Sequence, residues 1–215
     1  MRGYLFRRAA RRALPYLWPV AGAMFILLTE PPAYALFLLA ATALHETGHL
    51  FAFLACGEPL PRFTGRRFGL LLTPQGEPLS PGRTLLICGA GPLFNLLACL
   101  ALLPALRGGN AGGAGFCFFA LHLYTALFNL LPLSGFDGGR MLAALFTLLF
   151  PPEVGRRAYT AVAVAGALFF YFFALFLSFA AGARPYPFLL ALFLLWQEAK
   201  SGGLFLEDER AFARK

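Results

Sequence analysis

His45-Glu46-Thr47-Gly48-His49 sets three polar, chemically active side chains inside an apolar run from Ala33 to Cys56. At about 3.6 residues per turn, His45 and His49 lie one turn apart on one helix face and can hold one zinc ion together. Glu46 lies about 100° round the same helix, where it can act as general base toward a water at that ion. A charge at the bilayer centre costs on the order of 3 kcal/mol, so polar groups here indicate a functional site.

The composition is that of an integral membrane protein. Hydrophobic residues make up 59% of the 215 residues and charged residues only 13%, which lies outside the range of soluble domains. The net charge of +8 could suit a nucleic-acid partner, but no nucleic-acid-binding pattern accompanies it. The basic residues instead begin with a cluster of five arginines just before the first apolar run, which is typical of a cytoplasmic membrane boundary: Arg2, Arg7, Arg8, Arg11 and Arg12.

The apolar runs predict an all-α integral membrane protein of one domain, 1–215, with about six transmembrane helices. The expected spans are 14–29, 33–56, 84–106, 113–131, 158–181 and 186–199. The fourth of these continues, with a break in the helix, to residue 150. The first and last are short for a hydrocarbon core that takes roughly 20 helical residues. A signal peptide ending near Ala33-Tyr34-Ala35 is the alternative for the first span, but this triplet already belongs to the next apolar run.

The basic residues also predict the orientation of the chain. With both termini in the cytoplasm, 16 of the 18 lysines and arginines lie on the cytoplasmic side, and only Arg107 and Arg184 lie outside. Residues 57–83 and the connection 150–158 are then cytoplasmic as well.

A tetrahedral catalytic zinc needs one more protein ligand besides two histidines. Asp137 is the only carboxylate between Glu77 and Glu153, and Pro132 and three glycines interrupt the apolar run around it. Irregular backbone at membrane depth is tolerated where it is buried in protein or lines a polar cavity. Asp137 is therefore either a metal ligand facing such a cavity or a solvated aspartate in a cytoplasmic loop.

Together, these stretches resemble the paired signatures of the site-2 protease family of intramembrane zinc metalloproteases. The family pattern is H-E-x-x-H followed by N-x-x-P-x-x-x-x-D-G, and the second motif is matched by Asn129, Pro132, Asp137 and Gly138. Gly91-Pro92-Leu93-Phe94-Asn95 is similar to the family's G-P-x-x-N element. The resemblance covers about Leu36 to Phe150, which in the family forms a three-span catalytic core. It implies a catalytic core at about 33–150, with 14–29, 158–181 and 186–199 as accessory spans.

This resemblance implies that Asp137 completes the zinc site and that Asn129 stabilises the transition state beside bound substrate. It implies a zinc endopeptidase of a bacterial-type cell membrane that cleaves membrane-embedded or membrane-proximal segments of protein substrates, with a regulatory membrane partner left open. The six-span layout is most similar to the stage IV sporulation protease branch. We expect no soluble C-terminal regulatory domain of that branch's kind.

Three further features have two interpretations each. His122 lies seven residues before Asn129 and either lines the cavity or is a hydrogen-bonded packing histidine. Asn95 either joins the active site or makes an interhelical hydrogen bond, which averages about 0.6 kcal/mol in membranes. The four cysteines are expected to be packing thiols, with a thiolate zinc ligand as the minority alternative: Cys56, Cys88, Cys99 and Cys117.

Between the second and third spans, the segment from Arg67 to Thr73 is too short to cross a membrane as a helix. Bounded by Gly65 and Pro74, it predicts a short membrane-associated strand. A protease must bind its substrate extended, and strand addition supplies that geometry, with Leu71 among the expected backbone donors. The alternative is an amphipathic interfacial segment anchored by Arg66 and Arg67.

Two other functions use the same residues. A catalytically silent membrane scaffold would keep the fold but not the chemistry, and the presence of both Glu46 and Asp137 argues against it. A metal transporter would use His45, His49 and Asp137 as a transit site. Transporters commonly contain internal repeats with paired broken helices, whereas this sequence has one broken helix and no repeat.

Overall fold

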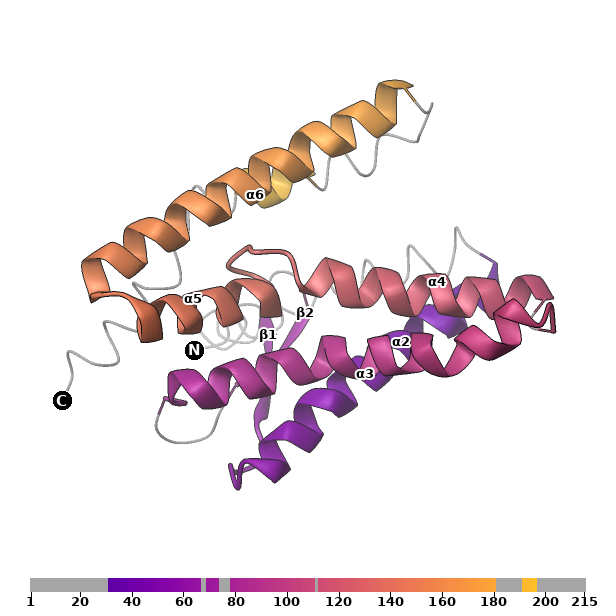
Figure 1. Ribbon diagram of the computed structural model, residues 1–215, viewed down its shortest axis with the longest axis horizontal. Helices are drawn as coiled ribbons and strands as arrows, with labels where there is room; N and C mark the ends of the chain where they lie inside the picture. Colours follow the sequence, from indigo (N-terminus) through magenta and orange to yellow (C-terminus); the bar gives the residue numbers. More distant parts are fainter. Residues whose placement is uncertain (1–30, 67–68, 74–77, 111, 181–190, 197–215) are drawn as a thin grey trace, which may run out of the picture. The chain divides into compact units, whose positions relative to one another are not determined.

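The computed structural model describes residues 31–66, 69–73, 78–110, 112–180 and 191–196. The described part is helical apart from one small sheet (Figure 1). Residues 191–196 are also helical. In chain order the elements are α2 (Pro32–Ala55), β1 (Arg62–Arg66), β2 (Gly69–Thr73), α3 (Pro81–Arg107), α4 (Gly112–Asn129), α5 (Asp137–Leu149) and α6 (Pro152–Ala180).

Three of these helices are long and apolar enough to cross a membrane: Pro32–Ala55, Pro81–Arg107 and Pro152–Phe176. They correspond to the second, third and fifth predicted spans, and their length and composition are those of membrane-spanning helices. The first predicted span, 14–29, lies outside the described residues, and of the last, 186–199, only 191–196 is described. The six-span layout and the orientation of the termini remain predictions.

The chain divides into two compact units, with one boundary before α3, one within α3 and one within α4. The first unit comprises Met1–Glu77 and Phe94–Thr125, and the second comprises Pro78–Leu93 and Ala126–Lys215. The single domain expected from the sequence stays a prediction.

In the first unit, α2 buries its two histidines among small residues on one face and exposes several large apolar side chains. Its buried residues recur at three- and four-residue steps, as one face of a helix requires: Ala41, His45, Gly48, His49 and Ala52. Leu36, Leu39, Phe51 and Leu54 are exposed. This pattern suits a helix surrounded by lipid, in which apolar side chains face the lipid and ionisable side chains face the protein interior.

Aromatic and sulfur contacts hold this unit together. The ring of Phe37 meets that of Phe118 on α4 edge-on at 5.5 Å, and Phe51 lies 5.8 Å from Phe94 on α3. The Cys99 thiol donates to the carbonyl oxygen of Phe119 at 3.6 Å, which links α3 to α4.

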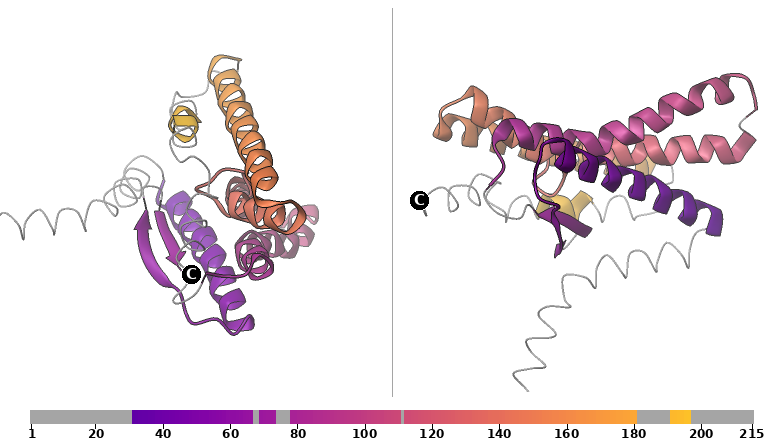
Figure 2. Two further views of the ribbon diagram at one scale, coloured as in Figure 1. Left: turned by 90° about the vertical axis from the view of Figure 1, so that its left-hand side faces the viewer. Right: turned by 90° about the horizontal axis from the view of Figure 1, so that it is seen from below.

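The predicted strand belongs to a two-stranded antiparallel hairpin (Figure 2). Its second strand, β2, covers most of the predicted segment, and Arg67 lies outside the described residues. The first strand was not predicted. An isolated strand has no partner for its backbone groups, and pairing with β1 provides partners along one edge of β2.

The second unit contains the predicted break. After α4 ends at Asn129, residues 130–136 form turns, including Leu133 N–H to Leu131 O at 2.8 Å and Phe136 N–H to Leu133 O at 3.0 Å. Pro132 has no N–H to continue a helix. The chain becomes helical again at Asp137, where a carboxylate in the first turn favours the positive end of the helix dipole.

After α5 the chain reverses direction, and α6 packs against α5 (Figure 1). Ala143 of α5 packs with Tyr159 and Ala163 of α6 in a buried cluster. A second cluster joins Leu133 of the break, Ala167 of α6 and Leu194. The break is therefore fixed by elements outside the predicted core of about 33–150.

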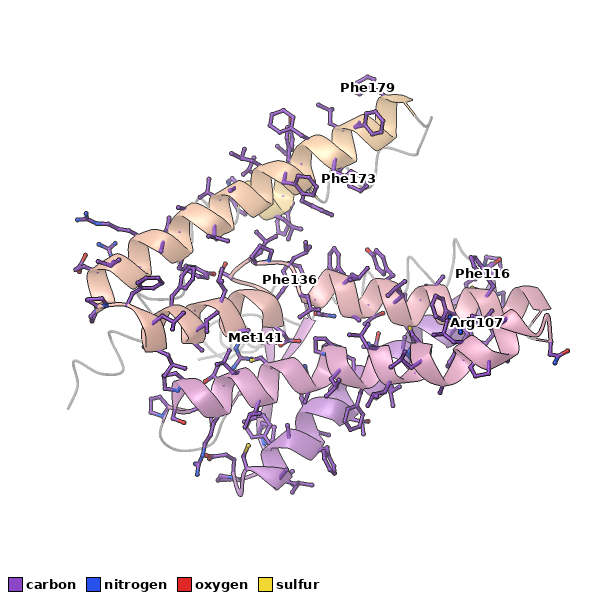
Figure 3. The ribbon with its side chains drawn as sticks, in the orientation of Figure 1. Arg107, Phe116, Phe136, Met141, Phe173 and Phe179 are labelled. Atoms are coloured by element: carbon purple, nitrogen blue, oxygen red, sulfur yellow. The ribbon has the colours of Figure 1, made fainter. Side chains whose placement is uncertain are left out.

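The predicted start of the fifth span was wrong. Residues 150–158 were expected to form a connection, but α6 begins at Pro152. Proline suits a first helical turn because its missing N–H would be unpaired there anyway. Glu153 also accepts a hydrogen bond from Arg156 at 2.9 Å one turn later, so these charged residues form part of the helix. Farther along α6, Phe173 and Phe179 project from the exposed surface (Figure 3).

Candidate metal centre

The sequence motif of α2 forms a close pair of imidazoles. His45 and His49 are 3% and 6% exposed, and their Nε2 atoms lie 3.1 Å apart with the rings nearly perpendicular at 84°. The four-residue spacing on one helix brings them together, as the sequence predicted. Both groups are buried within an apolar helix, where a polar side chain needs a partner.

The spacing of this pair fits a shared zinc ion. With Zn–N bonds of about 2.0–2.1 Å, two nitrogens of a tetrahedral site lie about 3.3 Å apart. The observed 3.1 Å is close to that value. It is also a hydrogen-bond distance, so the same arrangement serves as an N–H···N pair when no metal is bound.

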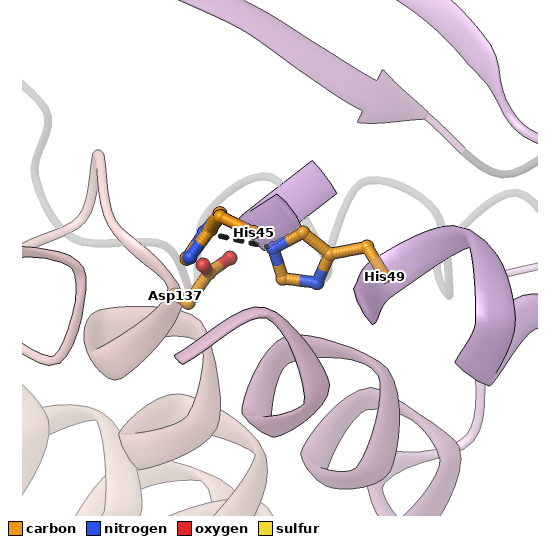
Figure 4. Close-up of side chains that lie close together, drawn as sticks. All are labelled: His45, His49 and Asp137. Carbon is orange, nitrogen blue, oxygen red and sulfur yellow. Dashed lines mark hydrogen bonds between the residues drawn. The ribbon is translucent and has the colours of Figure 1, made fainter. Parts of the chain in front are cut away.

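Asp137 supplies the carboxylate that the two histidines lack. Ligand atoms of His45, His49 and Asp137 all lie within 4.8 Å of one another (Figure 4). Two imidazoles and one carboxylate are a common zinc ligand set with one position left for water or substrate. This grouping supports the metal-ligand interpretation of Asp137.

The cysteines do not join this group. All four are free thiols, with Cys88 and Cys99 buried and Cys56 and Cys117 half-buried. The group of potential ligands found among the described residues contains no cysteine. The packing role of the thiols stays a prediction.

A chain of polar side chains extends from His45 across the first unit. The amide nitrogen of Asn95 lies 3.4 Å from His45 Nδ1, and the amide oxygen lies 2.9 Å from His122 Nδ1. Asn95 is 0% and His122 1% exposed. The sequence identified each residue as a candidate but did not predict the contacts between them. Asn95 and His45 are 50 residues apart, and spacing along one helix cannot predict a contact between two helices.

The other predicted site residues are placed as follows. Glu46 follows His45 on α2 and is half-buried, as is Asn129, the last residue of α4. The ring of Pro132 packs against Gly166 of α6. Gly138 lies so close to the Leu130 carbonyl oxygen that a Cβ would collide with it. Leu71 lies in β2.

No protein-family model matches the chain. A Synechocystis protein described as "Putative zinc metalloprotease sll0528" is 33% identical over 119 residues, which make up 52% of this chain and 30% of that protein. The chain thus spans less than a third of this relative's length.

A solved structure, the site-2 protease from Methanocaldococcus jannaschii, matches over 88% of both chains with a TM-score of 0.59 and 20% sequence identity. The likeness shows a shared fold. Together with the Synechocystis match, it supports the resemblance of this chain to the site-2 protease family of zinc metalloproteases.

Proposed function

We propose that this protein is a zinc metalloendopeptidase that hydrolyses peptide bonds in membrane-embedded or membrane-proximal segments. The observation that carries the proposal is the grouping of His45, His49 and Asp137, with ligand atoms within 4.8 Å of one another. The two histidines are buried in a helix long and apolar enough to span a membrane. The fold shared with a site-2 protease adds support.

The proposed reaction uses one zinc ion held by His45, His49 and Asp137. When bound there, zinc would lower the pKa of a water ligand to about 7 and polarise the scissile carbonyl. Glu46 would take the proton from the attacking water and pass it to the leaving amine. Asn129 would donate its amide N–H to the oxyanion that develops on the carbonyl oxygen.

The proposed substrate is a membrane-spanning protein that pairs with the outer edge of β2. Among the described residues the sheet has two strands, so one edge of β2 is not covered by another strand. Arg66 pairs with Gly69 at the turn end of the hairpin, and we expect this closing pair to be a hydrogen-bonded one. Hydrogen-bonded and non-hydrogen-bonded pairs then alternate along the two strands. The backbone donors facing outward are then Leu70 and Leu72, and that of Leu71 faces β1. This shifts the expected substrate contact by one residue from the sequence prediction.

In the cell, such an enzyme would act in regulated intramembrane proteolysis, with substrate entering from the cytoplasmic side. The positive-inside pattern supports this side, since residues 57–83 carry the hairpin. A regulatory membrane partner would control access to the site.

The test is cleavage of tagged single-span substrates by the full chain in lipid vesicles, comparing the wild type with Glu46→Gln. The amide keeps the shape of the carboxylate but cannot accept a proton, so turnover should fall by about 10²–10⁴-fold. Zinc content should stay the same. Equal cleavage by both proteins would exclude Glu46 as the base, and zinc binding without any cleavage would favour a scaffold or a transporter.

A further inference from the structure

We infer that Asn95 and His122 are positioning residues that set which nitrogen of His45 carries its proton, and thereby whether His45 can bind zinc. The inference rests on the proposed zinc site. It concerns three buried side chains from three helices, with His45 on α2, Asn95 on α3 and His122 on α4. All three lie in the first compact unit.

The contacts of the Asn95 amide group indicate which nitrogen of each neighbouring imidazole carries its proton. The amide N–H of Asn95 faces His45 Nδ1 at 3.4 Å, so Nδ1 accepts and the His45 proton sits on Nε2. That Nε2–H can then donate to Nε2 of His49 at 3.1 Å. On the other side of the amide, His122 Nδ1–H donates to the Asn95 oxygen at 2.9 Å.

Zinc binding requires the opposite arrangement. His45 Nε2 must offer its lone pair to the metal, so the proton moves to Nδ1 and needs an acceptor. A half-turn of the Asn95 amide brings its oxygen to His45 and its nitrogen to His122. The amide then donates to His122 Nδ1, whose proton must move to Nε2. Each ring carries one proton in both arrangements, so no charge changes in the buried network.

His122 can follow the amide, but the move leaves its proton on a nitrogen without an acceptor, so His122 favours the arrangement in which its proton is on Nδ1. Its Nε2 atom is buried and has no hydrogen-bond partner in the described part of the chain. Among the described residues, the polar contact of its side chain is the one to Asn95, and the neighbouring Phe118 ring, 4.3 Å away between centroids, offers no strong donor or acceptor. The tautomer of His122 then reports the orientation of the Asn95 amide.

A purely structural role would predict something different. Asn95 could simply tie α3 to α4, as the thiol of Cys99 does one turn farther along the same helix. In that case replacing either residue would loosen the helix pair without a specific effect on zinc. Cys99→Ala is therefore the matched control for Asn95→Leu.

The first measurement is the zinc dissociation constant of the full chain in detergent, from competition with a chelator. Asn95→Leu should weaken zinc binding by about 10–100-fold, as expected for the loss of a partner that orients a ligand. Cys99→Ala should change it less than about threefold. Asn95→Asp should restore near wild-type affinity, because a carboxylate offers an oxygen to both neighbours.

The double variant separates orientation from packing. His122→Leu should strengthen zinc binding in the wild type, because the hydrogen bond from His122 then no longer holds the amide oxygen of Asn95 away from His45. Combined with Asn95→Asp, the same change should have no further effect, because a carboxylate needs no orientation. An equal effect of His122→Leu in both backgrounds would mean that His122 only packs.

The second measurement follows the tautomers directly. The chain contains three histidines, so ¹⁵N-histidine labelling of the full chain in vesicles gives few signals to assign. Adding zinc should move the proton of His122 from Nδ1 to Nε2 in the wild type but not in Asn95→Leu. An unchanged His122 tautomer, or unchanged zinc affinity in Asn95→Leu, would overturn the inference and leave the proposed function standing. A wild-type chain that binds no zinc would instead overturn both.

Discussion

Asp137 would give the proposed metal site a negative charge that two neutral imidazoles do not provide. A doubly charged ion buried in an apolar protein is costly unless its charge is partly compensated, and a carboxylate does this while also acting as a ligand. The position of Asp137 at the start of α5 adds a second role, since its charge favours the positive end of that helix. In the proposed site, one residue would thus serve both as a ligand and as part of the local fold.

Asp137→Ala should lower zinc affinity by more than the roughly 10–100-fold typical of an outer hydrogen-bonding partner, because a ligand itself is lost. Zinc content per chain, measured after dialysis against buffered zinc, checks this. Glu153→Ala is the control, since that carboxylate pairs with Arg156 near the start of α6. Full zinc occupancy in Asp137→Ala would remove Asp137 from the ligand set.

At the scale of single residues, spacing along one helix was enough to predict the histidine pair. The same rule could not find the contact between Asn95 and His45, because it depends on how α3 packs beside α2. The sequence did show that Asn95 is an isolated amide in an apolar run, which indicates that it has a buried hydrogen-bond partner but not which residue this is.

At the scale of elements, the break between α4 and α5 depends on glycine. A Cβ at Gly138 would collide with the carbonyl group of Leu130, and one at Gly139 would collide with that of Leu133. Both obstacles are backbone, which cannot rotate away as a side chain can. The turns of 130–136 therefore pack directly on the first turn of α5, and this contact sets where Asp137 begins the helix.

Gly138→Ala should destabilise the protein by about 1–3 kcal/mol, as overpacking against rigid groups does. It should also lower zinc affinity, because the break must shift beside Asp137. Gly113→Ala is the matched control, since a Cβ there meets nothing within 4 Å and alanine favours a helix. Unfolding in mixed micelles and zinc competition check both effects; similar results for the two variants would show that the break tolerates the methyl group.

The break also depends on α6, which the sequence treated as accessory. A Cβ at Gly166 would lie 2.7 Å from Cγ of Pro132. Sequence motifs identify residues that do chemistry, but Gly166 has no such signature, and its role appears only when α6 packs on the break. The early start of α6 was missed for a related reason, because Glu153 and Arg156 look like a polar loop until their pairing within a helix is known.

Gly166→Ala should destabilise the protein by about 1 kcal/mol through contact with the Pro132 ring. Combined with Pro132→Ala, the cost should be less than the sum of the two single changes, with a coupling of at least about 0.5 kcal/mol, because the ring that obstructs the new methyl group is gone. The free energy of unfolding of all four proteins in mixed micelles gives this coupling. Additive effects would mean that the two residues do not act on each other.

At the scale of the whole molecule, the chemistry and the delivery of substrate belong to neighbouring stretches of sequence. The hairpin follows α2 and precedes α3, so the helix that carries Glu46 leads directly into the proposed substrate strand. The sequence predicted β2 but not β1, since a strand's partner is defined by pairing and not by local composition. Knowing the register changes which backbone groups should contact a substrate.

Leu72→Pro should lower kcat/KM for cleavage about fivefold, because it removes one outward backbone donor, worth about 1 kcal/mol, while a proline is tolerated on a strand edge. Leu72→Val keeps the donor and should have little effect. Leu71→Pro should instead disrupt pairing with β1, which exchange of the hairpin amides would detect. Zinc binding should survive all three changes, since none touches a ligand.

The direction of entry can be tested on the same strand. In a chain without its four cysteines and carrying Glu46→Gln to trap substrate, single cysteines at positions 69–73 should crosslink to a cysteine near the scissile bond of a tagged substrate. Strand pairing predicts the strongest crosslinks at alternate positions, because successive side chains of a strand point to opposite faces. Crosslinks that form only from residues 107–113, which the positive-inside pattern places on the opposite side, would show that substrate arrives from there and that the hairpin does not receive it.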